Sequence, residues 1–147
     1  MTQGEDPRGG EARGRLLCIE DNATNMAFLE AALADMHGVT LIKATTAAEG
    51  IRLARAEQPD LVLLDMHLPD FDGLEVVRVL NIEIAAGLKV VILTADNLSM
   101  EVVKAMSLGA REYWLKPIDV QRLREGVARY LRIGAAGVAG SARPQNR

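Results

Sequence analysis

One short run of residues constrains the fold of this chain most: Leu61–Leu64 are four consecutive apolar residues, and Asp65 ends the run. A run this short and this apolar is typical of a central strand in a parallel sheet, buried on both faces. Pro69, four residues later, prevents the strand from continuing. Asp65 is therefore predicted to lie at the carboxyl end of a central strand, where open α/β sheets bind their ligands.

Four further strands are predicted along the chain, and helical patterns separate them. The five predicted strands are 16–19, 39–43, 61–65, 90–94 and 113–115, and the second of them is less apolar and so closer to an edge. The five predicted helices run from Asn22 to near Gly38, from Thr46 to before Pro59, from Leu74 to near Gly87, from Ser99 to Leu108 and from Asp119 to Leu131. Thr46 and Glu49 match a capping box, and Ser99 and Asp119 are predicted to cap their helices. The alternation predicts a doubly wound α/β fold, with a five-stranded parallel sheet flanked by five helices.

The size and charge of the chain exclude several classes of protein. Its 147 residues, 49% apolar and 25% charged, are typical of one globular domain. The net charge of −3 gives no electrostatic footprint for nucleic acid or an anionic membrane. There is no apolar run of about 20 residues and no N-terminal signal pattern, so we expect a cytoplasmic protein. Cys18 is the single cysteine, which excludes an internal disulfide, and its place in a buried strand predicts inert packing.

The two ends of the chain differ in composition from its middle. Residues 1–14 contain almost no apolar side chains and are predicted to form a disordered arm, and small residues from Gly134 to Arg147 predict a flexible tail. The folded domain is expected to span residues 15–133.

Polar residues follow four of the five predicted strands. Glu20 and Asp21 follow the first strand, Asp65 ends the third, Thr94 ends the fourth, and Lys116 follows the fifth. Since the carboxyl ends of parallel strands share one edge of a sheet, these side chains are predicted to converge on one site.

The chemistry of these residue types is consistent with phosphoryl transfer. Three neighbouring carboxylates repel one another, and Lys116 alone cannot balance them. An all-oxygen site of this kind suits Mg²⁺, which also binds phosphate oxygens. An aspartate can attack phosphorus and form an aspartyl phosphate. Asp65 is therefore a candidate nucleophile, with Lys116 and Thr94 as groups that neutralise or bind the phosphoryl oxygens.

With these residues in order, the chain resembles the response-regulator receiver domains of two-component signalling, the CheY-like modules, from about Arg15 to Ile133. The resemblance rests on Glu20-Asp21, on the segment from Asp65 through Pro69 to Gly73, on Thr94-Ala95 and on Lys116-Pro117. It departs from the family at Glu20, where aspartate is more frequent, and at Leu68, where methionine is usual. The resemblance implies a flavodoxin-like sheet with the strand order 2-1-3-4-5.

The resemblance also implies roles for the residues at the strand ends. Asp65 would accept a phosphoryl group from a phosphohistidine, and Lys116, before a cis proline, would bind its oxygens. The Mg²⁺ ligands would be Asp21 and Asp65 directly, Glu20 through water, and Met66 through its backbone carbonyl. Thr94 and Tyr113 would form the switch pair. His67 and Asp96 lie where the family tunes the lifetime of the phosphoryl group.

The expected partners are proteins. The resemblance implies a sensor histidine kinase or a histidine phosphotransfer protein as donor, and a downstream protein that binds the surface of the helix 99–108, the strand 113–115 and the helix 119–131. The helix 99–108 is apolar on more than one face, which fits either deep packing or such a partner surface.

The sequence is consistent with three functions. The first is a stand-alone receiver, a phosphoacceptor that catalyses only its own phosphorylation and dephosphorylation. The second is a phosphatase of the haloacid-dehalogenase type, although His67 stands where those enzymes usually carry a second acid. The third is an adaptor that does not depend on phosphorylation. Asp70 and Asp72 are interpreted as turn residues and not as ligands.

Overall fold

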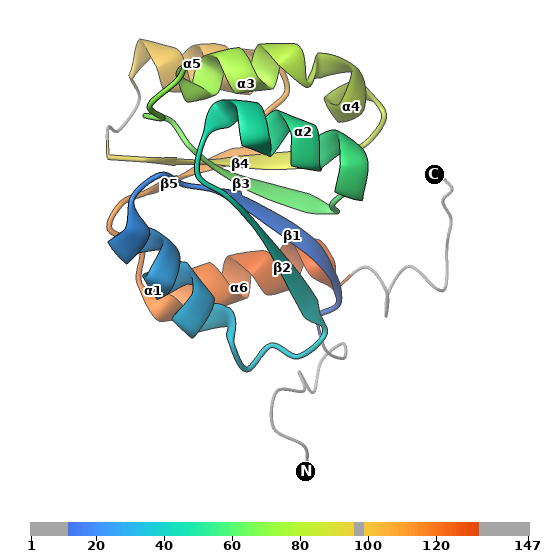
Figure 1. Cartoon of the computed structure of the whole chain (residues 1–147), viewed down its shortest axis with the longest axis vertical. Helices are drawn as coiled ribbons and strands as arrows, with labels where there is room; N and C mark the ends of the chain where they lie inside the picture. Colours follow the sequence, from blue (N-terminus) through green and yellow to red (C-terminus); the bar gives the residue numbers. More distant parts are fainter. Residues whose placement is uncertain (1–11, 96–98, 133–147) are drawn as a thin grey trace.

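A five-stranded parallel sheet forms the centre of the protein in the computed structural model, which describes residues 12–95 and 99–132 (Figure 1). The strands are β1 (Gly14–Ile19), β2 (Val39–Ala44), β3 (Leu61–Asp65), β4 (Lys89–Thr94) and β5 (Glu112–Leu115). The helices within these residues are α1 (Ala23–Leu33), α2 (Ala47–Glu57), α3 (Gly73–Val79), α4 (Asn81–Ala85), α5 (Met100–Ser107) and α6 (Val120–Leu131).

The strands are ordered β2-β1-β3-β4-β5, and all neighbours are parallel, which confirms the predicted fold and strand order. Strand β2 lies at an edge, as its mixed sequence predicted. Strand β3 lies between β1 and β4 and is buried along its whole length. The sheet therefore brings the carboxyl ends of β1, β3, β4 and β5 to one edge.

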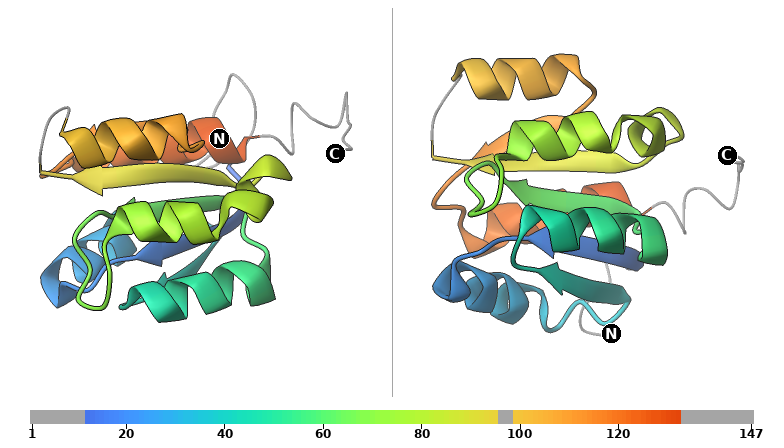
Figure 2. Two further views of the ribbon diagram at one scale, coloured as in Figure 1. Left: turned by 90° about the horizontal axis from the view of Figure 1, so that it is seen from above. Right: turned by 45° about the horizontal axis from the view of Figure 1, so that its top comes forward.

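Helices cover both faces of the sheet and enclose two cores (Figures 1 and 2). Helices α1 and α6 lie on one face, and α2, α3, α4 and α5 lie on the other. Alternate residues of β3 point to opposite cores: Leu61 and Leu63 join the core under α1 and α6, whereas Val62 and Leu64 join the other. This double burial explains why β3 is a continuous apolar run.

Side chains cap most of the helices, and three of these caps were predicted. Thr46, Ser99 and Asp119 accept hydrogen bonds from the N–H groups of the third helical residues of α2, α5 and α6. The reciprocal half of the predicted capping box is not formed, because the Glu49 carboxylate pairs with Arg52 instead. Asp72 caps α3, so its interpretation as a turn residue is confirmed.

The helix predicted from Leu74 to near Gly87 is wrong as a single element, and the described residues therefore contain six helices where five were expected. The backbone leaves the helical conformation at Leu80, whose side chain is fully buried, and it resumes as α4. Arg55 of α2 donates to the Val79 carbonyl at 3.1 Å and to Glu83 at 3.0 Å. These contacts join α2 to the end of α3 and to α4, on either side of the break.

Two other boundaries also differ from prediction. Helix α1 ends at Leu33, so Met36 lies beyond it. Strand β1 begins at Gly14, and Ala12 is already buried against the core under α1 and α6, so order begins before Arg15. The rest of the predicted arm and the predicted tail lie outside the described residues.

None of the helices in the described ranges has the length and apolar character needed to cross a membrane.

Candidate functional site

Asp65 lies at the last position of β3, with its side chain almost fully buried at the carboxyl edge of the sheet. The His67 N–H donates to its Oδ1 atom at 3.2 Å. The next residue, Met66, adds one more hydrogen bond between β3 and β4: its N–H donates to the Leu93 carbonyl at 3.1 Å. The backbone on both sides of Asp65 is therefore fixed by its neighbours.

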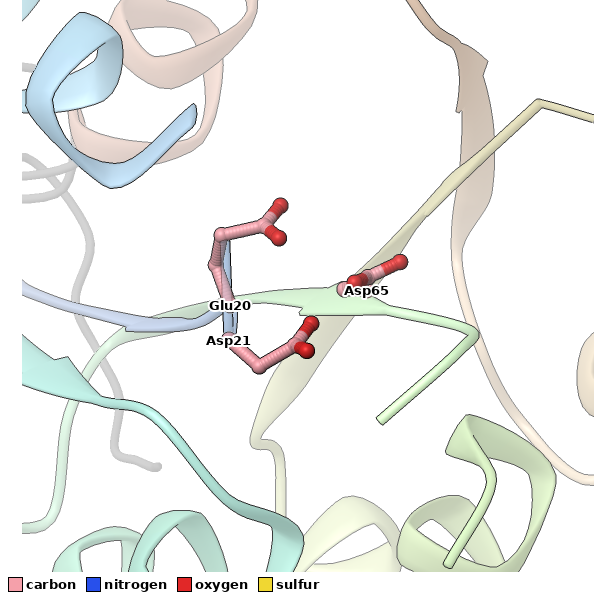
Figure 3. A group of neighbouring side chains, drawn as sticks. All are labelled: Glu20, Asp21 and Asp65. Carbon is pink, nitrogen blue, oxygen red and sulfur yellow. The ribbon is translucent and has the colours of Figure 1, made fainter. Parts of the chain in front are cut away.

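Glu20 and Asp21 follow β1 directly and lie beside Asp65 (Figure 3). One carboxylate oxygen from each of the three residues lies within 4.8 Å of the others. Glu20 is 1% exposed, whereas Asp21 is exposed to solvent. The cluster is therefore buried on one side and open on the other, as a site that exchanges a ligand with solvent must be.

Lys116 approaches the same cluster from the end of β5. Its Nζ atom lies 3.2 Å from Glu20 Oε1 and 3.3 Å from Asp65 Oδ1, and the Lys116 N–H donates to the Thr94 carbonyl at 2.8 Å. The Lys116-Pro117 peptide bond is cis, as predicted. One ammonium group thus faces three carboxylates, and the site keeps an excess of negative charge.

Burial and the neighbouring charges both act on the Glu20 carboxyl. Burial raises the pKa of the Glu20 carboxyl, and the nearby charge of Asp65 raises it further, although the Asn22 N–H and Lys116 act in the opposite direction. Glu20 Oε1 is buried and accepts no hydrogen bond from the described part of the chain, even with Lys116 Nζ close to it. A buried carboxylate oxygen of this kind is stabilised by a cation.

The donor set fits Mg²⁺. All the available ligands are oxygens, which this cation prefers, and the open side at Asp21 leaves room for the waters that it retains. The Met66 carbonyl accepts the Gly73 N–H at 2.8 Å, and a carbonyl has a second lone pair that can bind a cation. Glu20, Asp21 and Asp65 are thus the residues that would hold the ion, and the ligand role of the Met66 carbonyl stays a prediction.

The two predicted switch residues lie on neighbouring strands. Thr94 ends β4 and is 2% exposed, next to the Lys116 end of β5. Tyr113 lies on β5 and is half-buried against the core that α2, α3 and α5 cover. Their role as a switch stays a prediction.

The remaining residues singled out in the sequence are His67, Asp96 and Cys18. His67 is exposed at the rim, and Asp96 lies outside the described residues. Cys18 is fully buried, and burial, with a smaller effect of the Glu20 charge, raises the pKa of its thiol to about 12. A thiol with this pKa is inert at neutral pH, in agreement with the packing role predicted for it.

Two features of the site edge were not predicted from the sequence. An apolar pocket of about 520 Å³ adjoins Glu20 and Lys116, between α1 and the connection from β5 to α6, with Phe28 and Ile118 in its wall. In addition, Asp70 in the loop after Asp65 binds the N-terminus of α2. Both depend on residues far apart in the chain, which no local pattern brings together.

The helix α5 combines the two alternatives left open by its sequence. Val102 and Ala105 are buried in the core, whereas Met100 and Val103 are 67% and 46% exposed. Leu115 on β5 and Val120 on α6 are also exposed. The helix thus has a packed face and an exposed apolar face.

Comparisons with known proteins agree with this geometry. The family described as "Response regulator receiver domain" matches residues 16–128. Protein PilH of Pseudomonas aeruginosa is 34% identical over 110 residues, covering 74% of this chain and 90% of PilH. Transcriptional regulatory protein AfsQ1 of Streptomyces coelicolor is 35% identical over 119 residues, covering 81% of this chain and 52% of AfsQ1. The chain thus spans about half the length of AfsQ1.

A solved structure shows the same fold. The signal receiver domain of a LuxO repressor protein from Vibrio parahaemolyticus superposes with a TM-score of 0.76 at 26% sequence identity, covering 88% of this chain and 99% of that one.

Proposed function

The chain belongs to the response regulator receiver domain family, and from that premise we propose that Asp65 accepts a phosphoryl group from a phosphohistidine in a Mg²⁺-dependent reaction. Receiver domains are signalling modules and generally bind Mg²⁺ at an acidic pocket. The observation that carries the proposal is the buried Asp65 carboxylate, with Glu20 and Asp21 on one side and Lys116 Nζ at 3.3 Å on the other.

The contacts at Asp65 support different tasks for its two carboxylate oxygens. Lys116 Nζ and the His67 N–H both lie at Oδ1, so we assign the attack on phosphorus to Oδ2. An oxygen–phosphorus bond then forms, the phosphorus–nitrogen bond of the donor breaks, and its electron pair leaves with the donor imidazole. A bound Mg²⁺ supplies charge neutralisation for the phosphoryl oxygens. Lys116 and the Thr94 hydroxyl bind the remaining phosphoryl oxygens.

Two surfaces of the protein are proposed to bind partner proteins. The apolar pocket between α1 and the β5–α6 connection opens beside Lys116, which supports it as the side from which a histidine kinase or phosphotransfer protein approaches. The exposed apolar residues of α5, β5 and α6 support that surface as the docking site of a downstream protein. Thr94 and Tyr113 would couple the two by shifting an equilibrium between inactive and active arrangements.

A stand-alone, cytoplasmic receiver remains part of the proposal. Coverage of 90% of PilH supports a single-domain protein, but a relative as long as AfsQ1 carries more chain than the matched region. Loss of the phosphoryl group by self-catalysed hydrolysis also belongs to the proposal. The family assignment favours the phosphoacceptor over the haloacid-dehalogenase alternative, and absence of turnover on small phosphate esters would separate the two.

The test is phosphorylation by acetyl phosphate with Mg²⁺, followed by intact mass spectrometry. We expect the mass of one phosphoryl group to be added to the wild type, to be lost after hydroxylamine treatment, and to be absent when EDTA replaces Mg²⁺. Asp65→Asn should abolish the addition. Asp35→Asn is a matched control, because Asp35 is exposed and pairs with Arg124 away from the site. Modification of the Asp65 variant would refute the assignment, and so would an unmodified wild type.

A further inference from the structure

The loop that follows Asp65 carries a second aspartate, Asp70, and its carboxylate binds the first turn of α2. Oδ1 accepts the Ala47 N–H and Oδ2 accepts the Ala48 N–H, both at 2.8 Å. The Thr46 hydroxyl accepts the next free N–H, that of Glu49, at 3.1 Å. A helix leaves its first four N–H groups without partners inside the helix. In α2, two of them are bound by a residue from a different loop.

The contact is electrostatically favourable. Aligned peptide dipoles place partial positive charge at a helix N-terminus, and hydrogen bonds to a charged carboxylate are stronger than neutral ones. Desolvation acts to raise the pKa of the Asp70 carboxyl, but the N–H groups of Ala48 and Ala47, with those of Asp70 and Phe71, outweigh it and lower the pKa below its ordinary value. Asp70 is therefore ionised at neutral pH and holds both N–H groups.

The loop held in this way is the one that carries the proposed metal ligand Met66. Its two ends are joined by the hydrogen bond from the Gly73 N–H to the Met66 carbonyl, at 2.8 Å. A side chain at Gly73 would lie 2.8 Å from Met66 Sδ and 2.9 Å from Met66 Cα, so the closure tolerates only glycine. Asp70 lies between these ends and joins the loop to α2 through its two carboxylate oxygens. The Met66 carbonyl is thus fixed by the closure and by the attachment to α2.

The other side of the contact leads back to the acidic cluster. Ala44 ends β2, two residues before Thr46, and its carbonyl accepts the Glu20 N–H at 2.9 Å. The segment that begins α2 therefore also positions the backbone of Glu20. Asp70 joins the segment behind Glu20 and Asp21 to the segment behind Asp65 and Met66.

We propose that Asp70 is a positioning residue for the acidic cluster: by holding the β3–α3 loop against the N-terminus of α2, it fixes the Met66 carbonyl and the Asp65 carboxylate at the distance that cation binding requires. The inference rests on the proposed function for the identity of the cation. Asp70 touches neither the cation nor the phosphoryl group, and it acts through the loop backbone.

The experiment compares the Mg²⁺ dissociation constant, measured by calorimetry, with amide hydrogen exchange in the metal-free protein. Asp70→Ala should weaken Mg²⁺ binding by about tenfold, the loss typical of outer-shell partners. It should also speed exchange at Ala47, at Ala48 and at the Gly73 N–H. Asp70→Asn keeps one acceptor oxygen and should give a smaller loss in both measurements.

Two control variants separate positioning from simpler effects. Thr46→Ala removes the cap that α2 supplies for itself but leaves the Asp70 contact, so exchange at Gly73 and Mg²⁺ affinity should stay at wild-type values. Asp72→Asn removes the same charge from the same loop without breaking the contact, and should also leave the affinity unchanged. Equal weakening by Asp70→Ala and either control would overturn the proposal, as would wild-type exchange at Gly73 in Asp70→Ala. If the wild type binds no Mg²⁺, the proposed function fails, while the exchange at Gly73 still reports whether Asp70 holds the loop.

Discussion

Strand β5 connects two charged clusters that are built differently. At its first residue, Glu112 accepts hydrogen bonds from Trp114 Nε1 at 2.9 Å, from Arg129 and from the Tyr130 hydroxyl. Just past its last residue, Lys116 faces the three carboxylates of the acidic cluster. The Glu112 carboxylate is therefore hydrogen-bonded by three donors, whereas the three carboxylates of the acidic cluster share one ammonium group.

The pKa values change in opposite directions at the two ends. Partial burial acts to raise the pKa of Glu112, but the hydrogen bonds from Arg129, Tyr130 and Trp114 outweigh it and lower the pKa. At Glu20 burial dominates, and the pKa is raised. A cluster that is neutralised by its own side chains stabilises the fold, and a cluster that is not neutralised needs a ligand from solution. The contrast distinguishes an ion cluster that its own side chains neutralise from one that keeps excess negative charge, and the second kind is typical of functional sites.

The largest expected effect distinguishes the basic side chains at the two ends of β5, Lys116 and Arg129. Lys116→Ala should slow phosphorylation by acetyl phosphate about a hundredfold at saturating Mg²⁺, because it removes a donor to the developing charge on the phosphoryl group. Arg129→Ala should leave that rate unchanged, since Arg129 binds Glu112 at the other end of the strand. The rate of mass increase measures both. An equal loss in the two variants would mean that the clusters are not functionally distinct.

The parts of the site that local patterns determine were predictable from the sequence. Asp65 and Lys116 end short apolar runs, and runs of this kind become parallel strands whose ends meet. Ser99 and Asp119 precede helical patterns and cap them, as such residues do in most proteins.

The parts that depend on tertiary contacts were not predictable. Trp114 is buried, and no local pattern predicts that Glu112 accepts its N–H together with two donors from α6. The break at Leu80 is flanked by contacts of Arg55, which is 24 residues from the Val79 carbonyl that it binds. Asp70 was interpreted only as a turn residue, and its partners on α2, which precede it by more than 20 residues, were not predicted. Helical periodicity carries no information about such partners.

A second prediction concerns stability. Glu112→Ala should lower the free energy of unfolding by about 2 kcal/mol, because the N–H of the buried Trp114 loses its acceptor. This corresponds to a fall in Tm of about 4 to 8 °C for a domain of this size. Thermal unfolding followed by circular dichroism measures the change.

The matched measurement for this variant is the rise in Tm produced by Mg²⁺. Binding to the native state should raise the Tm of the wild type. The rise should be the same in Glu112→Ala, since the acidic cluster lies at the opposite end of β5. A smaller rise in this variant would show that the two clusters are coupled through the strand, contrary to the comparison.

The smallest expected effect is the pH dependence of the free energy of unfolding that is due to Glu112. Its pKa in the folded state lies below the ordinary value of 4.5. The contribution of Glu112 to stability is therefore fully present above about pH 4.5, and it is lost as the pH falls through the folded-state pKa. Glu112→Gln cannot titrate, so the difference in unfolding free energy between wild type and this variant should be constant near neutral pH and should shrink below pH 4.5.

Tyr130→Phe tests the cause of this pH dependence. The variant keeps the Glu112 carboxylate and its bonds to Arg129 and Trp114 but removes one donor, so the folded-state pKa of Glu112 should move back toward 4.5. The loss of stability should begin at the same pH as in the wild type, because the unfolded-state pKa sets its onset, but it should be complete at a higher pH and should be smaller in total. Urea unfolding at a series of pH values measures both quantities. Coincident curves for wild type and Tyr130→Phe would show that Arg129 and Trp114 alone lower the pKa, and the Tyr130 hydroxyl would then have no part in neutralising this end of β5.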